Sequence, residues 1–296
     1  MPQKPVGVIG LGLMGAAITE RLLEDGYPVV VFNRTRDKAA PLEALGARWS
    51  DNPLRECDRV VISLYTTEVV QEVLRQLEPG LTPGKVLIDT TTGNPQLTGE
   101  LVAWLAERGV EYLEVPISGS SEQTRRREAT ALAAGRRDAF DACRDIMDSL
   151  AAKTYFVGPC GNALRMKLVA NLVLGLNRAA LAEGLVFAKA VGLVPQDALE
   201  VLMNSPAYSR TMDAKGPKMV AGDFTPQAKV SQHLKDVRLI LAEAARAGQD
   251  LPLSMLHRKL LERAEALGCG ELDNSAIIQA ISQSGAASNE TSGKNK

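Results

Sequence analysis

The first half of the chain alternates between short runs of branched apolar residues and longer segments with helical periodicity. The apolar runs are bounded by Gly, Pro, Asp or Asn, which is typical of buried strands. Strands that alternate with helical segments of about 10–15 residues indicate βαβ units and a parallel sheet. The predicted strands are VGVIG, VVVFN, RVVISL, KVLIDT and VEYLEV, and the predicted helices between them span residues 14–25, 36–45, 68–77 and 95–108.

The pattern changes after about residue 165, where apolar residues recur only with helical spacing. Two weaker strands, ATALAAG and KTYFVG, come before this point and flank a predicted helix at residues 139–150. Glycine and proline separate the later helical segments, as helix stops and starts commonly do. These helices are predicted at residues 164–191, 196–203, 225–247, 254–267 and 274–282.

This change of pattern predicts two domains, which a length of 296 residues readily accommodates. The first, over residues 1–164, is expected to be an α/β domain with a doubly wound parallel sheet. The second, over residues 165–284, is expected to be all-α. Residues 285–296 are small and polar, so we predict a disordered tail there.

The first predicted strand ends in a glycine-rich turn, with Gly10, Gly12 and Gly15 in the GxGxxG spacing. The turn follows an apolar strand and opens an amphipathic helix, which is the context that a dinucleotide-binding Rossmann motif requires. Gly10 permits the tight turn, Gly12 lets the backbone approach a pyrophosphate, and Gly15 lets the helix pack on the strand. We therefore predict a dinucleotide cofactor at this turn, with Leu11, Leu13 and Met14 as part of its site.

The end of the second strand indicates which dinucleotide binds. A free ribose 2′-hydroxyl is usually held by an acidic residue there, but this chain has Asn33, Arg34 and Thr35. Arg34 can stack on adenine and pair with a 2′-phosphate, which favours NADP (NADPH). NAD stays an alternative because Asp37 is close, and Arg34 and Arg36 can also be read as solvated loop charges.

Composition argues against several other classes of function. A net charge of −1 argues against nucleic acid or an anionic membrane as the main partner, and no run approaches the ~18 consecutive apolar residues of a spanning helix. The N-terminus shows no signal peptide, and the four cysteines form no CxxC pair, so we expect a cytoplasmic protein with free thiols. The two histidines leave little material for a metal site or a Ser-His-Asp triad.

The segment GNALRMKLVANLVLG is apolar almost all the way round but contains Lys167 and Asn171, four residues apart and so on one helical face. A buried ammonium is costly unless it is paired or used. Hydride transfer to a carbonyl needs a proton donor, and with so little histidine Lys167 is the leading candidate. Asn171 can orient the ammonium or the substrate. The competing interpretation is a lysine that reaches solvent beside a locally bonded asparagine.

Five motifs resemble, in order and spacing, those of the β-hydroxyacid dehydrogenases. This family includes 3-hydroxyisobutyrate dehydrogenase, tartronate semialdehyde reductase and the glyoxylate/succinic semialdehyde reductases. The resemblance extends over about residues 6–281. The motifs are GLGLMG at residues 10–15, DTTTGNP at 89–95, EVPISGS at 114–120, GPCGNALRMKLVAN at 158–171 and HLKDVRL at 233–239.

The resemblance implies an NADP-binding Rossmann domain followed by a helical domain for substrate binding and oligomerisation. It further implies an NADPH-preferring enzyme that interconverts a small semialdehyde or 2-oxoacid with its hydroxyacid, acts on a small carboxylate and forms a homodimer or homotetramer. By this resemblance Lys167 is the catalytic acid, and Asn171 binds or orients the substrate. Ser118 and Gly119 would bind the substrate carboxylate. Thr92 would lie near the nicotinamide, Lys235 would reach the substrate or cofactor, and Leu64 is assigned to the cofactor site as well.

One segment departs from the family pattern. Where the family has a small-residue loop, this chain has SSEQTRRREAT, with Ser120 in place of a common glycine and a basic run at residues 125–127. The basic run is either part of a site for a more anionic substrate or a solvated turn.

Three other functions remain as alternatives. Phosphogluconate dehydrogenases have a histidine where this chain has Ala170, and imine reductases typically lack the lysine. A non-catalytic NADP-binding sensor or dimerisation protein would also tend to lose Lys167.

Overall fold

The computed structural model describes residues 4–283, so the tail predicted at residues 285–296 lies outside the described residues. The chain divides into two compact units, Met1–Lys167 and Leu168–Lys296. Each unit is described by itself below.

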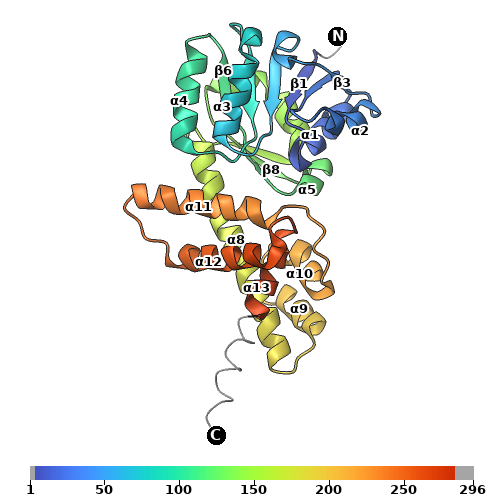
Figure 1. Cartoon of the computed structure of the whole chain (residues 1–296), viewed down its shortest axis with the longest axis vertical. Coiled ribbons are helices and arrows are strands. Elements are labelled where there is room, and N and C mark those ends of the chain that lie inside the picture. Colours follow the sequence, from blue (N-terminus) through green and yellow to red (C-terminus); the bar gives the residue numbers. More distant parts are fainter. Residues whose placement is uncertain (1–3, 284–296) are drawn as a thin grey trace. The chain divides into compact units, whose positions relative to one another are not determined.

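The first unit is built on a six-stranded, all-parallel sheet (Figure 1). The strand order β3-β2-β1-β4-β5-β6 reverses direction at β1, as in a doubly wound nucleotide-binding sheet. The Rossmann-type fold predicted from the alternating pattern is therefore confirmed. The strands are β1 (Val6–Ile9), β2 (Val29–Phe32), β3 (Arg48–Trp49), β4 (Arg59–Ile62), β5 (Val86–Asp89) and β6 (Glu111–Glu114).

Side chains along each strand alternate between two apolar clusters, because successive residues of a strand point to opposite faces. Val31 packs in one cluster with Ile18 of α1. Val30 packs in the other with Leu74 of α3 and Leu105 of α4. The helices that connect these strands are α1 (Leu13–Glu24), α2 (Ala40–Glu43), α3 (Thr67–Gln76) and α4 (Pro95–Ala106), with 3₁₀ turns at Arg36–Ala39, Pro53–Arg55 and Glu78–Gly80.

A second, three-stranded sheet of order β7-β8-β9 completes this unit. β7 runs antiparallel to β8, and β8 runs parallel to β9. An isolated bridge between Glu114 and Ala134 links the end of β6 to this sheet. Its elements are β7 (Ile117–Ser118), α5 (Ser121–Arg125), β8 (Thr130–Ala133), α6 (Arg137–Ala142), α7 (Arg144–Leu150) and β9 (Lys153–Phe156).

The second unit is helical, as predicted. Its longest helix, α8, starts in the first unit and runs without interruption over Asn162–Ala190. By length and composition alone α8 could cross a membrane, although the core helix of a soluble protein passes the same test. The other helices are α9 (Pro195–Met203), α10 (Thr211–Ala221), α11 (Val230–Arg246), α12 (Pro252–Ala264) and α13 (Ile277–Ser282), with a π turn at Glu265–Cys269 and a 3₁₀ turn at Asn274–Ala276.

Several predicted elements differ from those observed. The helix predicted at residues 36–45 is a 3₁₀ turn followed by the short α2, and the helix predicted at 139–150 is divided at Cys143 into α6 and α7. The helix predicted at 225–247 begins only at Val230, because Asp273 accepts hydrogen bonds from the N–H groups of Gln227 and Ala228 and holds that segment in an irregular conformation.

Helix α10 was not predicted from the sequence. It contains Gly216 and Pro217, which together resemble a helix break. Tertiary contacts keep it helical: a Cβ on Gly216 would lie 2.5 Å from Leu199, and the Nζ atom of Lys215 is 2.9 Å from both carboxylate oxygens of Asp273.

Candidate active site

The turn after β1 has the geometry of an anion-binding loop. Gly10 has φ +96°, a conformation that favours glycine, and a Cβ on Gly15 would lie 1.8 Å from the Gly10 carbonyl oxygen. Gly12 is exposed with open space beside it, so a ligand can approach its backbone. No side chain caps the start of α1, and its first turn has no acidic residue. The helix N-terminus is therefore suited to a pyrophosphate.

Asn33 connects this turn to the end of β2. Its Oδ1 atom accepts a hydrogen bond from the Leu11 N–H at 3.0 Å, and its Nδ2 group donates to the Thr35 carbonyl at 2.9 Å. The two predicted parts of the cofactor site thus lie together. Leu13 and Thr35 are exposed near them, and Met14 is half-buried.

The two arginines that follow Asn33 differ in their contacts. Arg36 is held by Glu43 at 2.6 and 2.9 Å and stacks on Trp49 at 4.4 Å. Arg34 is exposed, and its side chain makes no hydrogen bond or ion pair within residues 4–283. Arg36 therefore stabilises the loop, whereas the Arg34 guanidinium is available to a ligand.

The loops after β4 and β5 lie beside the glycine turn. A Cβ on Gly10 would be 2.8 Å from the Leu64 side chain, and the Leu64 N–H donates to Thr91 Oγ1 at 3.1 Å. Thr92, the next residue, is half-buried. Leu64 and Thr92 are therefore at the same carboxyl edge of the sheet as the glycines.

Ser118 and Gly119 lie at the end of β7, where both are partly exposed. A Cβ on Gly119 would be 2.8 Å from the Ala129 Cβ, so the close approach of β7 to Ala129 leaves room only for glycine. Ser120 caps α5 by a reciprocal pair of hydrogen bonds with Gln123. This cap explains a serine where the family commonly has glycine.

The basic run after Ser120 is largely engaged in ion pairs. The Arg125 guanidinium donates to Glu20 of α1 at 2.5 and 3.3 Å, and that of Arg126 pairs with Glu122 one turn earlier at 2.9 Å. These contacts favour a structural role for Arg125 and Arg126 over recruitment of substrate.

Helix α8 begins against a buried carboxylate at the end of β6. The Gly161 N–H donates to Glu114 Oε1 at 2.6 Å, and the Leu164 N–H donates to Oε2 at 3.4 Å. Burial raises the pKa of Glu114 to about 7. Lys167 follows in the second turn of α8 and is itself only 6% exposed.

In the second unit, Asn171 is buried and its Nδ2 group donates to Asp236 Oδ2 on α11 at 2.9 Å. The ammonium of Lys235 lies 3.3 Å from Asp236 Oδ1. The sequence prediction included Asn171 and Lys235 but missed Asp236. The available signal was an aspartate among the apolar positions of α11, next to the lysine that was chosen.

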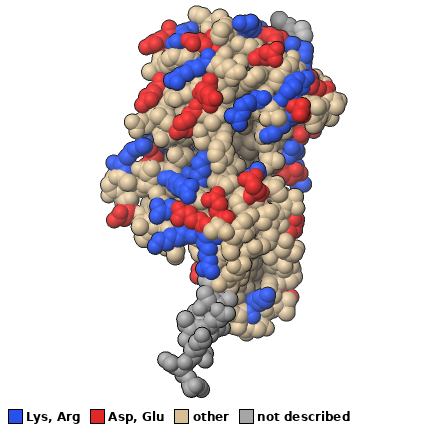
Figure 2. All heavy atoms as spheres, viewed as in Figure 1, with Lys and Arg blue, Asp and Glu red and all other residues tan. Residues whose placement is uncertain are grey.

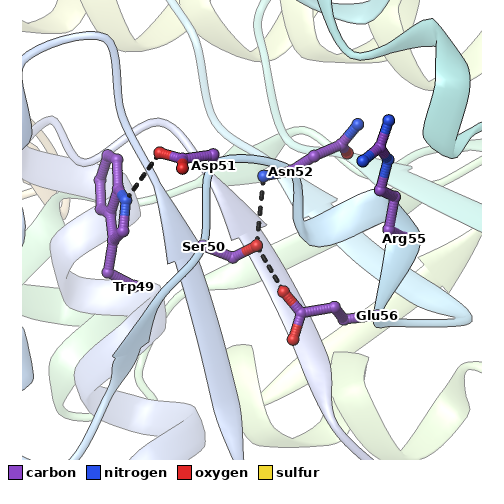
Figure 3. Close-up of a pocket in the computed structure, with 6 residues that line it drawn as sticks. All are labelled: Trp49, Ser50, Asp51, Asn52, Arg55 and Glu56. Atoms are coloured by element: carbon purple, nitrogen blue, oxygen red, sulfur yellow. Dashed lines mark hydrogen bonds between the residues drawn. The ribbon is translucent and has the colours of Figure 1, made fainter.

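A pocket in the first unit lies away from the predicted site residues. It has a volume of about 410 Å³ and is situated beyond the end of β3 (Figure 3). Several of its polar groups bond to one another, for example Ser50 Oγ to Glu56 at 2.5 Å. None of the predicted site residues lines it, so it does not locate the cofactor. Within residues 4–283, no three His, Cys, Asp or Glu residues are grouped to hold a metal ion.

The sheet and its glycine turn define a nicotinamide-dinucleotide-binding protein, and comparisons with known proteins agree. Residues 5–158 match a family model described as the NAD binding domain of 6-phosphogluconate dehydrogenase. Residues 161–281 match one described as "NAD-binding of NADP-dependent 3-hydroxyisobutyrate dehydrogenase". The chain belongs to the β-hydroxyacid dehydrogenase family, as the motifs predicted.

Proteins with different functions are similar to this chain. The cytokine-like nuclear factor N-PAC of Homo sapiens is 30% identical over 285 residues, which are 94% of this chain but 51% of N-PAC. The chain thus spans about half the length of the N-PAC relatives that it matches. Glyoxylate/succinic semialdehyde reductase 2 of Arabidopsis thaliana is 29% identical over 93% of this chain and 79% of the relative. The structure of 3-hydroxyisobutyrate dehydrogenase from Salmonella typhimurium aligns with a TM-score of 0.86 at 26% identity, over 94% of this chain and 99% of that one.

Together, the two family models support the binding of a nicotinamide dinucleotide cofactor. The residues of the first unit fit such a cofactor: the glycine turn leaves space for a pyrophosphate, and the start of α1 offers uncapped N–H groups to it.

Proposed function

We propose that this protein is an NADPH-preferring oxidoreductase that interconverts a small semialdehyde or 2-oxoacid with its hydroxyacid. The observation that supports it best is the arrangement in the first unit. There the glycine turn and the start of the Lys167 helix, fixed to Glu114, both lie at the carboxyl edge of the sheet. Ligands of open α/β sheets bind at this edge.

In the proposed mechanism a nicotinamide cofactor held at the glycine turn would supply the hydride that the carbonyl carbon receives. Lys167 donates a proton from its Nζ atom to the carbonyl oxygen, and the reverse reaction returns that proton to Lys167. Ser118 and the Gly119 backbone bind the substrate carboxylate. Asn171 orients the reacting groups, and Asp236 holds the Asn171 amide in one orientation through its 2.9 Å hydrogen bond. Lys235 binds the substrate or the cofactor.

The proposed NADPH preference is supported by Arg34. No carboxylate ends β2 to accept a ribose hydroxyl, and the Arg34 guanidinium is exposed beside Asn33, which contacts the glycine turn. A planar guanidinium matches the oxygens of a 2′-phosphate.

The direct test mixes the purified protein with NADPH and a panel of short semialdehydes and 2-oxoacids, and follows the loss of nicotinamide absorbance. We expect oxidation of NADPH with at least one member of the panel and much slower oxidation of NADH. Tight NADPH binding without turnover on the whole panel would contradict the enzymatic proposal.

That outcome would support a second function, a non-catalytic NADP-binding protein. The match to the nuclear factor N-PAC favours considering it. The presence of Lys167 in the motif GPCGNALRMKLVAN weighs against it, because a non-catalytic member of the family would tend to lose this lysine.

We further propose that the protein is a homodimer or homotetramer. Helix α8 has an exposed apolar stripe formed by Val169, Val173 and Phe187, and Val191 extends it just past the end of the helix. These four side chains are 50–66% exposed. At 100° per residue these four side chains fall within about 40° of one another. Figure 2 shows a wide uncharged area over one part of the helical unit, whereas basic and acidic residues are interspersed over the rest of that unit and over the first unit.

A further inference from the structure

The carboxylate of Glu114 takes the place of a helix cap for α8. The first N–H groups of a helix have no partner within the helix and need an acceptor from elsewhere. Glu114 provides it from the end of β6, 47 residues earlier in the chain than Gly161, with its two oxygens 2.6 Å from the Gly161 N and 3.4 Å from the Leu164 N. An anion is also favoured at this end of a helix by the helix dipole.

This contact fixes the part of α8 that holds Lys167. Leu164 and Lys167 are three residues apart, so they lie on the same side of the helix in successive turns. A helix moves as a stiff unit over such a distance. Any loosening of the turn at Gly161–Leu164 therefore changes the position of the Lys167 ammonium.

Three acidic groups lie close to Glu114. Asp89 is its neighbour on β5, Tyr112 lies two residues before it on β6, and Cys160 precedes Gly161. The Tyr112 hydroxyl donates to Asp89 Oδ2 at 2.5 Å. Cys160 donates weakly to the Tyr112 carbonyl and itself faces Glu111.

Burial of these acids makes their ionisation costly. Burial raises the pKa of Glu114 to about 7 and that of Asp89 to about 6, and the nearby Asp89 carboxylate adds to the cost of ionising Glu114. Burial also raises the pKa of Cys160 to about 12, so its thiol stays protonated. Among these groups, Glu114 is the one that changes charge near neutral pH while bonded to α8.

We propose that Glu114 is a positioning residue: its ionised carboxylate holds the first turn of α8 and thereby the Lys167 ammonium, and its protonation releases that turn. The consequence for turnover rests on the proposed function of Lys167. The consequence for the helix does not.

The first test therefore needs no substrate. Amide hydrogen exchange of the intact protein is followed at Gly161 and Leu164 by NMR and expressed as protection relative to the intrinsic rate. In the wild type, protection should fall about 10- to 100-fold as the pH is lowered from about 8 to about 6, as expected when hydrogen bonds to a charged acceptor are lost. In Glu114→Gln it should be low throughout.

The matched control is Glu111→Gln, which removes a glutamate from the same strand. Glu111 pairs with Arg136 and has no hydrogen bond to α8. Its variant should keep the wild-type protection and its pH dependence. Equal protection in wild type and Glu114→Gln would overturn the proposal. If Glu114→Gln does not fold, wild-type protection that stays constant over this pH range would overturn it equally.

The second test measures turnover. In the wild type, kcat should rise with an apparent pKa near that of Glu114, whereas Glu114→Gln should have a low kcat without this acidic limb and an unchanged KM for NADPH. A Glu114→Gln enzyme that keeps the wild-type limb contradicts the positioning role. Absence of turnover in every variant would count against the proposed function alone, and the amide protection would still decide the role of Glu114.

Discussion

Lys167 is the residue on which turnover depends in the proposed mechanism. We expect Lys167→Ala to lower kcat by ~10²–10⁴-fold, the usual contribution of a positioned general acid, with NADPH binding retained. Steady-state kinetics and cofactor titration measure the two effects separately. Lys189→Ala, an exposed lysine on the same helix, is the control and should have wild-type rates. A Lys167→Ala enzyme with most of its activity would exclude the lysine as the acid.

At the same scale, the proposed preference for NADPH depends on Arg34. Arg34→Ala should weaken NADPH binding by about 10- to 100-fold, the loss expected for a hydrogen bond between charged groups, and leave NADH binding nearly unchanged. Fluorescence titration with both cofactors is the measurement. Arg126→Ala removes an exposed arginine just after α5, which pairs with Glu122, and serves as the control. Equal losses for NADPH and NADH would contradict contact with the 2′-phosphate.

At the scale of elements, α8 is packed closely at one glycine and loosely at another. A Cβ on Gly175 would lie 2.4 Å from His233 Nε2 and 2.6 Å from His257 Cε1, on α11 and α12, whereas one on Gly184 would have nothing within 4 Å. Gly175→Ala should therefore lower the free energy of unfolding by ~1–3 kcal/mol, the usual cost of overpacking.

Gly184→Ala is the matched control on the same helix. It should raise the free energy of unfolding by up to ~1 kcal/mol, because alanine is the better helix former. Urea denaturation followed by circular dichroism compares the two variants. Equal effects of the two substitutions would show that the contacts at Gly175 do not limit helix packing.

The elements themselves were largely predictable from sequence, and the errors have local causes. β1, α1, β2, β4, α3, β5 and α4 follow the alternation of apolar runs and amphipathic segments closely, because side-chain periodicity reports the element directly. The two-residue strand β3 was not predicted, because so short a strand has no periodicity to detect. Helix α10 was missed because Gly216 and Pro217 resemble a break, and only contacts with Leu199 and Asp273 show why the helix continues.

At the scale of the whole molecule, the two units should respond in opposite directions to mild acid. In the second unit, burial and the nearby Arg178 lower the pKa of His257 from its ordinary 6.5 to about 4. Between these pH values the unfolded chain binds a proton that the folded unit does not, so the stability of this unit falls as the pH is lowered.

The stability of the first unit depends on pH in the opposite sense. The pKa values of Glu114 and Asp89 are raised in the folded state, so the folded unit binds protons that the unfolded chain lacks, and its stability rises as the pH falls. Hydrogen exchange resolved by region at about pH 7 and about pH 5 measures both units. In the first unit the strands of the six-stranded sheet are compared, because Gly161 and Leu164 are expected to respond separately to the protonation of Glu114. A parallel change in the two units would contradict these assignments.

The stripe on α8 provides a prediction on assembly. Phe187→Glu should convert the proposed homodimer or homotetramer into a species of smaller mass, because it places a charge in a buried apolar contact. Light scattering on a sizing column gives the mass, to compare with 31.7 kDa for one chain. Lys189→Glu introduces the same residue away from the stripe and should leave the mass unchanged. An unmodified protein with the mass of a single chain would refute the assembly.

The sequence by itself determined the parallel sheet, the helical second half, the glycine turn and the presence of Lys167 and Asn171 on one helical face. These features depend on periodicity and on residue spacing over a few positions, where neighbours in sequence are also neighbours in space.

Only the tertiary structure decided how those residues are held. It showed that Glu114 accepts the first N–H groups of α8, that Asp236 binds Asn171 from 65 residues away, and that Arg125 pairs with Glu20 of α1. It also separated Arg36, held by Glu43 and Trp49, from the exposed Arg34. The physical reason is that each contact joins positions whose distance in space is set by the packing of whole elements, which local sequence does not encode.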